Sequence, residues 1–323
     1  MSQTTTKLVV GLGPVTASVV EPILGSEIRF VENPTPEDIA NAEGAIVRAA
    51  YVVDKKVLDQ AKKLKVIART GVGFDLVDIE ESNRRGIPVV ITPGSNTNAV
   101  AEGVLAHILH LSKRLGPLTK LVASGKFNER TNYPVGDLEE NTLGIVGYGR
   151  IGQRVAHLAK AFGMSVIAFD PYANIPAEIK AGDLDELFTK ANVITLHVLL
   201  TKETTNLINT QSLKKFIDGT ILVNCSRGAL IDLDAALEAL NSGKLAGVGL
   251  DVFDPEPPIH HPIFDHENVV LTPHVMGLSK QATLATFIDA AKGVRDVLDG
   301  VEPKAIANSI SYNDVIQNRK ITE

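Results

Sequence analysis

The sequence contains a single cysteine, Cys225, and no tryptophan among its 323 residues. One thiol can form neither an internal disulfide nor a multi-cysteine metal site, so we expect a reducing compartment, the cytoplasm. No run approaches the roughly 18 uninterrupted apolar residues that a membrane-spanning helix needs. The first seven residues, MSQTTTK, lack the basic segment and the apolar run of a signal peptide, so none is expected.

The chain also has little excess charge. Its net charge is −6, from 32 basic and 38 acidic residues, so no basic field would attract nucleic acid or an anionic membrane, and we expect neither as a partner. Hydrophobic residues make up 44% and charged residues 22%, which excludes a disordered or collagen-like chain. The length suits two domains of about 100–200 residues each.

Short runs rich in valine and isoleucine alternate with longer amphipathic segments along almost the whole chain. Strands that are apolar on both faces are typical of parallel sheets covered by helices. The pattern therefore predicts an α/β protein with two parallel-sheet lobes. The predicted strands are 7–10, 45–47, 65–68, 87–91, 142–146, 165–169, 193–196, 220–224, 247–250 and 269–271. The predicted helices are 36–41, 54–63, 76–85, 99–124, 151–162, 184–190, 210–216, 232–242 and 281–298.

The two longest helical patterns, 99–124 and 281–298, have the length of helices that connect two lobes. From them we predict a central lobe of residues 99–288, inserted in an outer lobe made of 1–98 plus 289–323. No repeat of 20–50 residues is visible.

The strongest motif is GYGRIG, residues 147–152, which ends one predicted strand and opens a predicted helix. In such a turn Gly147 permits the tight bend, Gly149 lets a pyrophosphate approach the backbone, and Gly152 lets the helix lie close to the strand. Asp170 ends the next strand, where an acid binds ribose hydroxyls. Its carboxylate would repel the extra phosphate of NADP, so the motif predicts NAD. A glycine-rich turn without a ligand is the alternative.

Three side chains that could carry chemistry follow predicted strands of the central lobe: Arg227, Glu256 and His274. Open α/β sheets bind ligands at these ends of their strands. A histidine titrates near neutrality and can give a proton to an alkoxide, and a carboxylate can orient it and favour its charged form. An arginine can bind a carboxylate and place positive charge beside a carbonyl oxygen. Taken singly, each could be a surface ion pair or a structural residue.

The other histidines suggest no metal site. His260, His261 and His266 share one loop, but their spacing fits no zinc pattern and no cysteine is near. His107 and His110 share a helix face without a nearby pair of carboxylates. We interpret both sets as surface or packing residues.

Together these segments resemble the D-isomer-specific 2-hydroxyacid dehydrogenase family. The family's motifs occur in order between about residues 7 and 308, namely GYGRIG with Asp170, NCSRGALID at 224–232, GLDVF at 249–253 and TPH at 272–274. The resemblance implies two Rossmann- or flavodoxin-like lobes, an NAD-binding central lobe, a substrate-binding outer lobe, a deep cleft and a homodimer built on the central lobe. It also implies that Arg227 binds and polarises the substrate, that Glu256 supports His274, and that His274 is the acid and base.

The same resemblance implies further contacts. Along the cofactor it places Arg150, Ile151, Val198, Cys225, Asp251 and Gly277. In the outer lobe it places the substrate carboxylate on backbone N–H groups of residues 70–73, which include Gly71, Val72 and Gly73. Leu199 stands where the family usually has proline, and Met276 stands where many relatives have a small or different residue, so the resemblance does not predict the shape of the cofactor pocket.

Two arginines suggest the substrate. Arg48 and Arg69 each follow an apolar strand, in the segments IVRAA and ARTG, which resemble the D-3-phosphoglycerate dehydrogenase branch of the family. Arginines at these positions there help to hold the substrate phosphate, and two guanidinium groups suit a dianion better than an aliphatic chain. The alternative is that they form ion pairs with Asp75, Asp78 or Glu102.

The resulting hypothesis is oxidation of D-3-phosphoglycerate to 3-phosphohydroxypyruvate, the entry to serine synthesis. One alternative is reduction of glyoxylate, hydroxypyruvate or another 2-keto acid. Another is an NADH-sensing binding protein without turnover. Since only a short polar tail follows Asn308, we expect no C-terminal regulatory domain.

Overall fold

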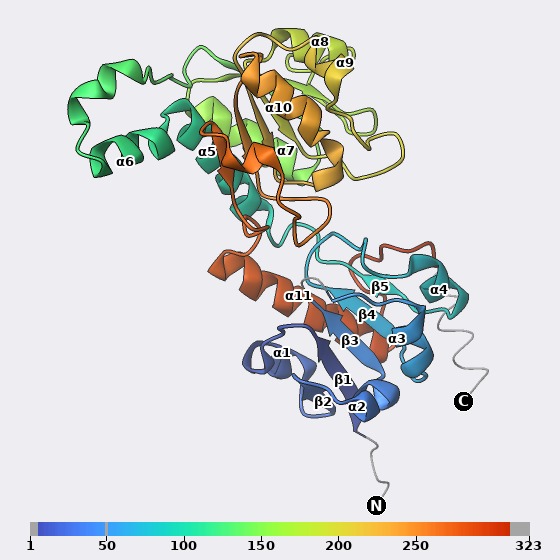
Figure 1. Ribbon diagram of the computed structural model, residues 1–323. Coiled ribbons are helices and arrows are strands. Elements are labelled where there is room, and N and C mark those ends of the chain that lie inside the picture. The colour runs from blue at the N-terminus through green and yellow to red at the C-terminus, as the bar shows by residue number, and fades with distance from the viewer. Residues whose placement is uncertain (1–5, 49–50, 311–323) are drawn as a thin grey trace, which may run out of the picture. The chain divides into compact units, whose positions relative to one another are not determined.

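The computed structural model describes residues 6–48 and 51–310, and the chain divides into two units (Figure 1). The first unit is Met1–Asn96 with Lys280–Glu323, and the second is Thr97–Ser279. This corrects the predicted boundary after residue 288, which falls inside helix α11 (Lys280–Leu298). The apolar face of α11, including Phe287 and Val294, packs on strands of the first unit, so the whole helix belongs there.

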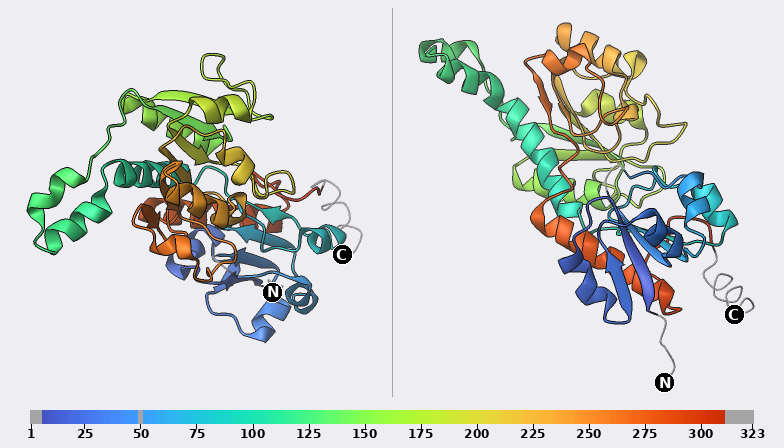
Figure 2. Two further views of the ribbon diagram at one scale, coloured as in Figure 1. Left: turned by 45° about the horizontal axis from the view of Figure 1, so that its top comes forward. Right: turned by 60° about the horizontal axis from the view of Figure 1, so that its bottom comes forward.

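The first unit is a parallel sheet of five strands in the order β2-β1-β3-β4-β5, the flavodoxin-like order. Its strands are β1 (Lys7–Leu12), β2 (Ile28–Val31), β3 (Gly44–Val47), β4 (Val66–Arg69) and β5 (Val89–Val90). Helices α1 (Ala17–Leu24) and α11 cover one face (Figure 2). The other face lies under α2 (Pro36–Asn41), α3 (Lys55–Gln60) and α4 (Ile79–Arg84).

The second unit is a parallel sheet of six strands in the order β11-β10-β9-β8-β6-β7. Its strands are β6 (Thr142–Val146), β7 (Ser165–Phe169), β8 (Val193–Leu196), β9 (Thr220–Asn224), β10 (Leu245–Leu250) and β11 (Val269–Leu271). Its α-helices are α5 (Thr97–Ser112), α6 (Leu115–Ala123), α7 (Arg150–Ala161), α8 (Leu184–Lys190), α9 (Thr210–Leu213) and α10 (Leu233–Asn241). Short 3-10 turns lie at Phe127–Asn132, Gly228–Leu230 and Pro262–Asp265.

Helices cover both faces of this sheet, with α5 and α7 over one core and α8 and α10 over the other. The first strand, β6, has β7 on one side and β8 on the other. This reversal of strand order is where open α/β sheets bind ligands, at the carboxyl ends of the strands. The predicted α/β class with two parallel-sheet lobes is confirmed.

The predicted helix 99–124 is two helices in the structure. Arg114 lies between α5 and α6 in the left-handed region, at φ +50°. Pro117 follows three residues later, and in a continuous helix its ring would clash with the carbonyl of residue 113. The amphipathic pattern continues across the break, which is why periodicity alone predicted a single helix.

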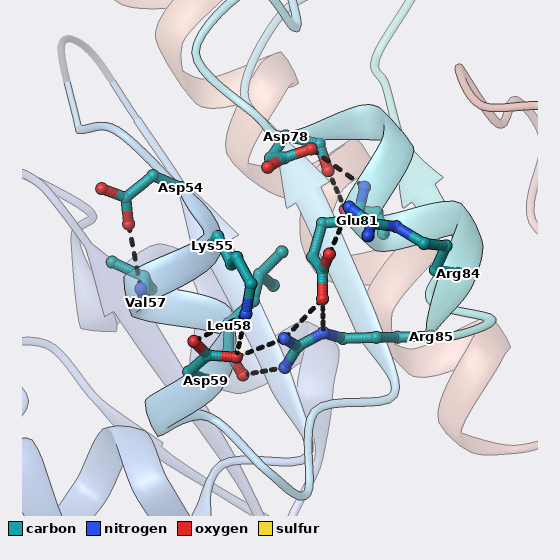
Figure 3. Close-up of polar contacts among 10 residues, drawn as sticks. Asp54, Lys55, Val57, Leu58, Asp59, Asp78, Glu81, Arg84 and Arg85 are labelled. Atoms are coloured by element: carbon teal, nitrogen blue, oxygen red, sulfur yellow. Dashed lines mark hydrogen bonds and ion pairs between the residues drawn. The ribbon is translucent and has the colours of Figure 1, made fainter.

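A network of charges joins α3 to α4 in the first unit (Figure 3). Arg85 donates from Nε to Glu81 Oε1 at 2.7 Å, from Nη1 to the Leu58 carbonyl at 2.5 Å and from Nη2 to Asp59 at 2.5 Å. Arg84 pairs with the other oxygen of Glu81 at 2.5 Å. Glu81 is only 6% exposed, so its charge depends on these two guanidinium groups.

We expect Arg85→Ala to lower the free energy of unfolding by about 2 kcal/mol, because the buried Glu81 loses one of its partners. Urea denaturation followed by circular dichroism measures the change. Lys55→Ala is the matched control, since Lys55 contacts the same Asp59 at the surface, with 61% and 53% of the two side chains exposed. It should cost less than about 0.5 kcal/mol. Equal effects of the two variants would contradict this account.

Candidate active site

The glycine turn between β6 and α7 contains two glycines that packing requires and one that it does not. Gly147 has φ +96°, and a Cβ there would lie 2.7 Å from the carbonyl carbon of His197. A Cβ on Gly152 would lie 2.2 Å from the carbonyl oxygen of Gly147. Around Gly149, by contrast, no atom lies within 4 Å of such a Cβ. Packing therefore requires the first and third glycines, while the second leaves open space at the start of α7.

Asp170 lies beside this turn, directly after β7. Its Oδ2 accepts from the N–H of Tyr148 at 2.8 Å, and its Oδ1 accepts from the N–H groups of Tyr172 and Ala173 at 2.8 and 3.1 Å. These bonds fix the carboxylate while leaving lone pairs for other donors. Arg150 and Ile151 form the first turn of α7, with Arg150 exposed.

This arrangement fits a dinucleotide. The open space at Gly149 and the free N–H groups of the first turn of α7 suit a pyrophosphate, and Asp170 suits ribose hydroxyls. Val198 follows β8 and accepts through its carbonyl from Ser226 Oγ at 2.7 Å, which links the loops after β8 and β9.

Two half-buried titratable groups in the loops after β8 and β9 are neutral. Burial lowers the pKa of His197 to about 4, and its ring lies 3.1 Å from Thr195 Oγ1. Burial, and to a lesser extent the charge of Asp251, raises the pKa of the Cys225 thiol. Cys225 therefore has no nucleophilic thiolate near neutral pH.

The loop after β9 holds Arg227 through a backbone turn. Asn224 is fully buried, and its side chain accepts from the N–H of Ser226 at 3.0 Å and donates to the Arg227 carbonyl at 2.7 Å. A Cβ on Gly228 would lie 2.0 Å from the carbonyl carbon of Phe253. Only glycine thus lets the Arg227 loop pack against the loop after β10, which carries Glu256.

Glu256 and His274 form a direct pair, with Glu256 Oε2 2.8 Å from His274 Nδ1. The other carboxylate oxygen accepts from the N–H of Phe253 at 3.0 Å, which fixes its orientation. The side chains are 38% and 51% exposed, so a small molecule can reach the imidazole. Arg227 is close enough for its charge to act on both groups. The second unit therefore brings together all three residues that the sequence singled out.

The pair favours a charged histidine. The hydrogen bond to Glu256 raises the pKa of His274, and although partial burial and the charge of Arg227 oppose this, the pKa stays above its ordinary value. For Glu256, burial raises the pKa, but the hydrogen bonds from His274 and Phe253 and the charges of His274 and Arg227 outweigh it, so the pKa is lowered. The site thus holds a proton on His274 Nδ1 and leaves Nε2 for a second partner.

His274 lies in the left-handed region at φ +53°, a conformation that costs about 1–3 kcal/mol. Asp251, which is 2% exposed, bonds through its carboxylate to residues on both sides of His274. Its Oδ1 accepts from Thr272 Oγ1 at 2.7 Å and from the N–H of Val275 at 2.9 Å, and its Oδ2 accepts from the N–H of Met276 at 3.1 Å. The resemblance gave Asp251 a cofactor contact, which stays a prediction, whereas its bonds in the structure go to the histidine loop. Gly277 follows Met276, half-buried.

The predicted substrate residues lie in the first unit. Arg48 donates from Nη1 to the Pro14 carbonyl at 3.2 Å and from Nη2 to Thr283 Oγ1 at 3.4 Å, and its guanidinium carbon lies 4.5 Å from the centre of the Phe287 ring. Burial lowers the pKa of Arg48. Arg69 donates from Nε to the Gly73 carbonyl at 3.0 Å. Ala49 and Ala50 of the same motif lie outside the described residues.

The loop from Gly71 to Gly73 is half-buried, and Gly71 has φ +145°. The carbonyl of Gly71 accepts from the N–H of Thr92 at 2.9 Å.

Among residues 6–48 and 51–310, no cluster of three or more histidine, cysteine or acidic side chains could hold a metal ion. In the same ranges, no helix is both long and apolar enough to cross a bilayer.

A sequence model described as "D-isomer specific 2-hydroxyacid dehydrogenase, NAD binding domain" matches residues 105–276. This chain belongs to the D-isomer-specific 2-hydroxyacid dehydrogenase family. The match covers most of the second unit, from within α5 to Met276, and includes the glycine turn, Arg227, Glu256 and His274. The resemblance seen in the sequence is confirmed, and NAD is the cofactor of this family's domain.

Individual relatives are also similar to the chain. It is 37% identical over 270 residues to a D-3-phosphoglycerate dehydrogenase of Synechocystis, covering 82% of this chain and 49% of that protein. The chain thus spans about half the length of that relative. It is 39% identical over 262 residues to a hydroxypyruvate reductase of Thermotoga maritima, covering 79% of this chain and 85% of that protein.

Among solved structures, a D-lactate dehydrogenase of Aquifex aeolicus in complex with NAD and lactic acid superposes with a TM-score of 0.80. The sequences are 28% identical, and the superposition covers 91% of this chain and 96% of that one.

Asn224, Gly228 and Thr272 lie in motifs that the sequence analysis quoted, but it assigned none of them a role of its own. Each acts through a backbone contact or a buried hydrogen bond rather than on a ligand. A signal for the role of Asn224 was its place at the end of an apolar strand, where asparagine commonly forms a side-chain turn.

Proposed function

We propose that this protein is an NAD-dependent dehydrogenase that transfers a hydride between the nicotinamide and the C2 carbon of a D-2-hydroxy acid. The observation that carries the proposal is the 2.8 Å bond between Glu256 and His274. It lies at the carboxyl ends of the sheet whose glycine turn fits the dinucleotide. A protein that only binds NAD would not need the bond between Glu256 and His274.

When bound, NAD supplies the hydride acceptor, and its reduced form supplies the donor. His274 Nε2 takes the proton of the substrate hydroxyl in oxidation and returns it to the carbonyl oxygen in reduction. Glu256 stabilises the imidazolium through Nδ1. Arg227 binds the substrate carboxylate and places positive charge beside the C2 oxygen, where negative charge develops during reduction.

The rate of 2-keto acid reduction should depend on pH through His274. Reduction needs the protonated imidazole, so activity is present below the pKa of His274 and is lost as pH rises through it. Because Glu256 raises that pKa, Glu256→Gln should move the falling limb of the kcat/KM profile to lower pH. An unchanged limb in this variant would contradict the role of Glu256.

For the substrate, we propose D-3-phosphoglycerate, oxidised to 3-phosphohydroxypyruvate at the entry to serine synthesis. Two observations support it. One is the similarity to D-3-phosphoglycerate dehydrogenases, and the other is the place of Arg48 directly after β3 and of Arg69 at the end of the neighbouring strand β4. The second candidate is hydroxypyruvate. It is favoured by the similarity to the hydroxypyruvate reductase of Thermotoga maritima, a relative of which the chain covers 85%.

The double variant Arg48→Ala, Arg69→Ala distinguishes the two candidates. Charge-assisted hydrogen bonds contribute about 1.5–3 kcal/mol each, so losing one from each arginine should lower kcat/KM for 3-phosphohydroxypyruvate by about 100-fold or more. Hydroxypyruvate, which has no phosphate, is the internal control for damage to the fold. An equal loss on both substrates would contradict a phosphate-binding role for these arginines.

A panel of 2-keto acids with purified protein and NADH, followed by NADH absorbance, tests the proposal as a whole. Turnover of 3-phosphohydroxypyruvate well above the others supports the phosphoglycerate reaction, and turnover of hydroxypyruvate supports the second candidate. NADH binding without turnover on any acid would refute the enzyme proposal and favour an NADH-sensing binding protein.

We further propose a cytoplasmic homodimer. The segment from α6 to residue 135 projects from the body of the second unit (Figures 1 and 2). It carries four exposed apolar side chains: Leu115, Val122, Phe127 and Val135. Exposed apolar area of this kind suits a second copy of the same chain. Sedimentation analysis should give a dimer for the wild type and a monomer for Val122→Asp, Phe127→Asp. A monomeric wild type would refute the dimer.

A further inference from the structure

Helix α5 contacts the histidine loop at two buried positions that the reaction chemistry does not require. Gly103 and His107 are four residues apart, so they lie on one face of the helix, and both are buried. The loop, residues 272–276, carries His274 and follows β11. All of these residues belong to the second unit.

His107 bonds to the start of the loop. Its Nε2 lies 3.2 Å from Thr272 Oγ1, and that hydroxyl donates its single proton to Asp251 Oδ1 at 2.7 Å. The imidazole must therefore donate from Nε2. Nδ1 is buried without a partner among the described residues, so a proton there would be unsatisfied, and burial lowers the pKa of His107. His107 is thus a neutral donor.

The same ring is closely enclosed. A Cβ on Gly249 of β10 would lie 2.9 Å from His107 Nδ1, so the glycine in the strand leaves the room that the imidazole occupies. The charged and titratable groups acting on His107 are Asp251 and His110. Those acting on His274 are Glu256, Asp251 and Arg227.

Gly103 receives the other end of the loop. A Cβ on Gly103 would lie 2.3 Å from Met276 Sδ and 2.7 Å from Met276 Cβ. The methionine side chain therefore fills the space that the glycine leaves on the helix. The N–H of Met276 donates to Asp251 Oδ2, so the same carboxylate that bonds to Thr272 also holds this end.

We propose that Gly103 and His107 are positioning residues that fix the orientation of His274. They attach both ends of its loop to a rigid helix, His107 through Thr272 and Gly103 through Met276, with Asp251 bonded to both ends. The proposal rests on the dehydrogenase function, since it concerns how His274 reaches the substrate. It also accounts for Met276, because the bulky side chain is matched by the glycine opposite.

Three variants at two helix positions test His107. His107→Leu removes the donor, so the loop should loosen, the Glu256 bond should weaken, and kcat for 2-keto acid reduction should fall about tenfold. The falling limb of the pH profile should move to lower pH, while the Kd for NADH stays unchanged. His107→Gln, whose Nε2 can donate at a similar place, should restore both kcat and the limb. His110→Leu, on the same helix but away from the loop, is the matched control and should change neither.

The Gly103 contact is tested independently and decides the proposal if His107→Leu does not fold. Gly103→Ala should push Met276 away and lower kcat, and adding Met276→Gly, which removes the Met276 Cβ as well as the rest of the side chain, should restore it. If the wild type reduces no 2-keto acid, the proposed function itself fails. If the wild type is active, two results would overturn the positioning role: an unchanged kcat and pH limb in His107→Leu, or no recovery in Gly103→Ala, Met276→Gly.

Discussion

The variant His274→Ala is expected to lower kcat for 2-keto acid reduction by about 10²–10⁴-fold, the usual contribution of a positioned acid and base. The imidazole is the group that can give the proton to the C2 oxygen, and its Nδ1 is held 2.8 Å from Glu256. The NADH affinity should not change, because in the described part of the chain the side chain of Asp170 bonds to the N–H groups of Tyr148, Tyr172 and Ala173, whereas the imidazole of His274 bonds to Glu256.

Steady-state kinetics with a 2-keto acid and fluorescence titration with NADH separate the two quantities. Thermal unfolding serves as the control for folding, and Glu256→Gln should show a smaller loss of kcat because it keeps the imidazole. If His274→Ala retained wild-type turnover, another group would have to carry the proton, and the assignment would be wrong.

The variant Gly149→Val is expected to weaken NADH binding by about 100-fold while leaving the fold unchanged. The valine side chain would enter the open space at the start of α7, where no atom of the protein lies within 4 Å of a Cβ. It would keep the pyrophosphate from the backbone N–H groups, and two charge-assisted hydrogen bonds lost at about 1.5 kcal/mol each give this factor.

Gly152→Ala is the matched comparison within the same turn. Its Cβ would lie 2.2 Å from the Gly147 carbonyl oxygen, so this variant should lower the melting temperature as well as the NADH affinity. Fluorescence titration and circular dichroism melting of both variants distinguish the cases. Wild-type affinity in Gly149→Val would place the pyrophosphate elsewhere.

The strands of the second unit could be predicted closely because they are apolar on both faces and are bounded by glycine, proline or polar residues. Five predicted strands, 142–146, 165–169, 193–196, 220–224 and 269–271, match the structure to the residue. In the first unit β2 and α1 were missed. Strand β2 is short and interrupted by the exposed Arg29, and α1 contains Pro22, which argues against a helix when only the sequence is read.

The catalytic candidates could be named from the sequence because their chemistry and their place after strands are both visible there. Their geometry could not. The Arg227 loop approaches the Glu256 loop only because Gly228 packs against the backbone of Phe253, a contact between residues 25 apart in the sequence. The contact of His107 with Thr272 spans 165 residues, so a histidine interpreted as surface or packing turned out to be a buried donor.

The most direct measurement of the central claim is the stoichiometry and configuration of the product that the wild type forms from a 2-keto acid and NADH. The account predicts one D-2-hydroxy acid for each NADH oxidised, and loss of this conversion in His274→Ala. An L-configured product, or bound NADH that no 2-keto acid can oxidise, would contradict it.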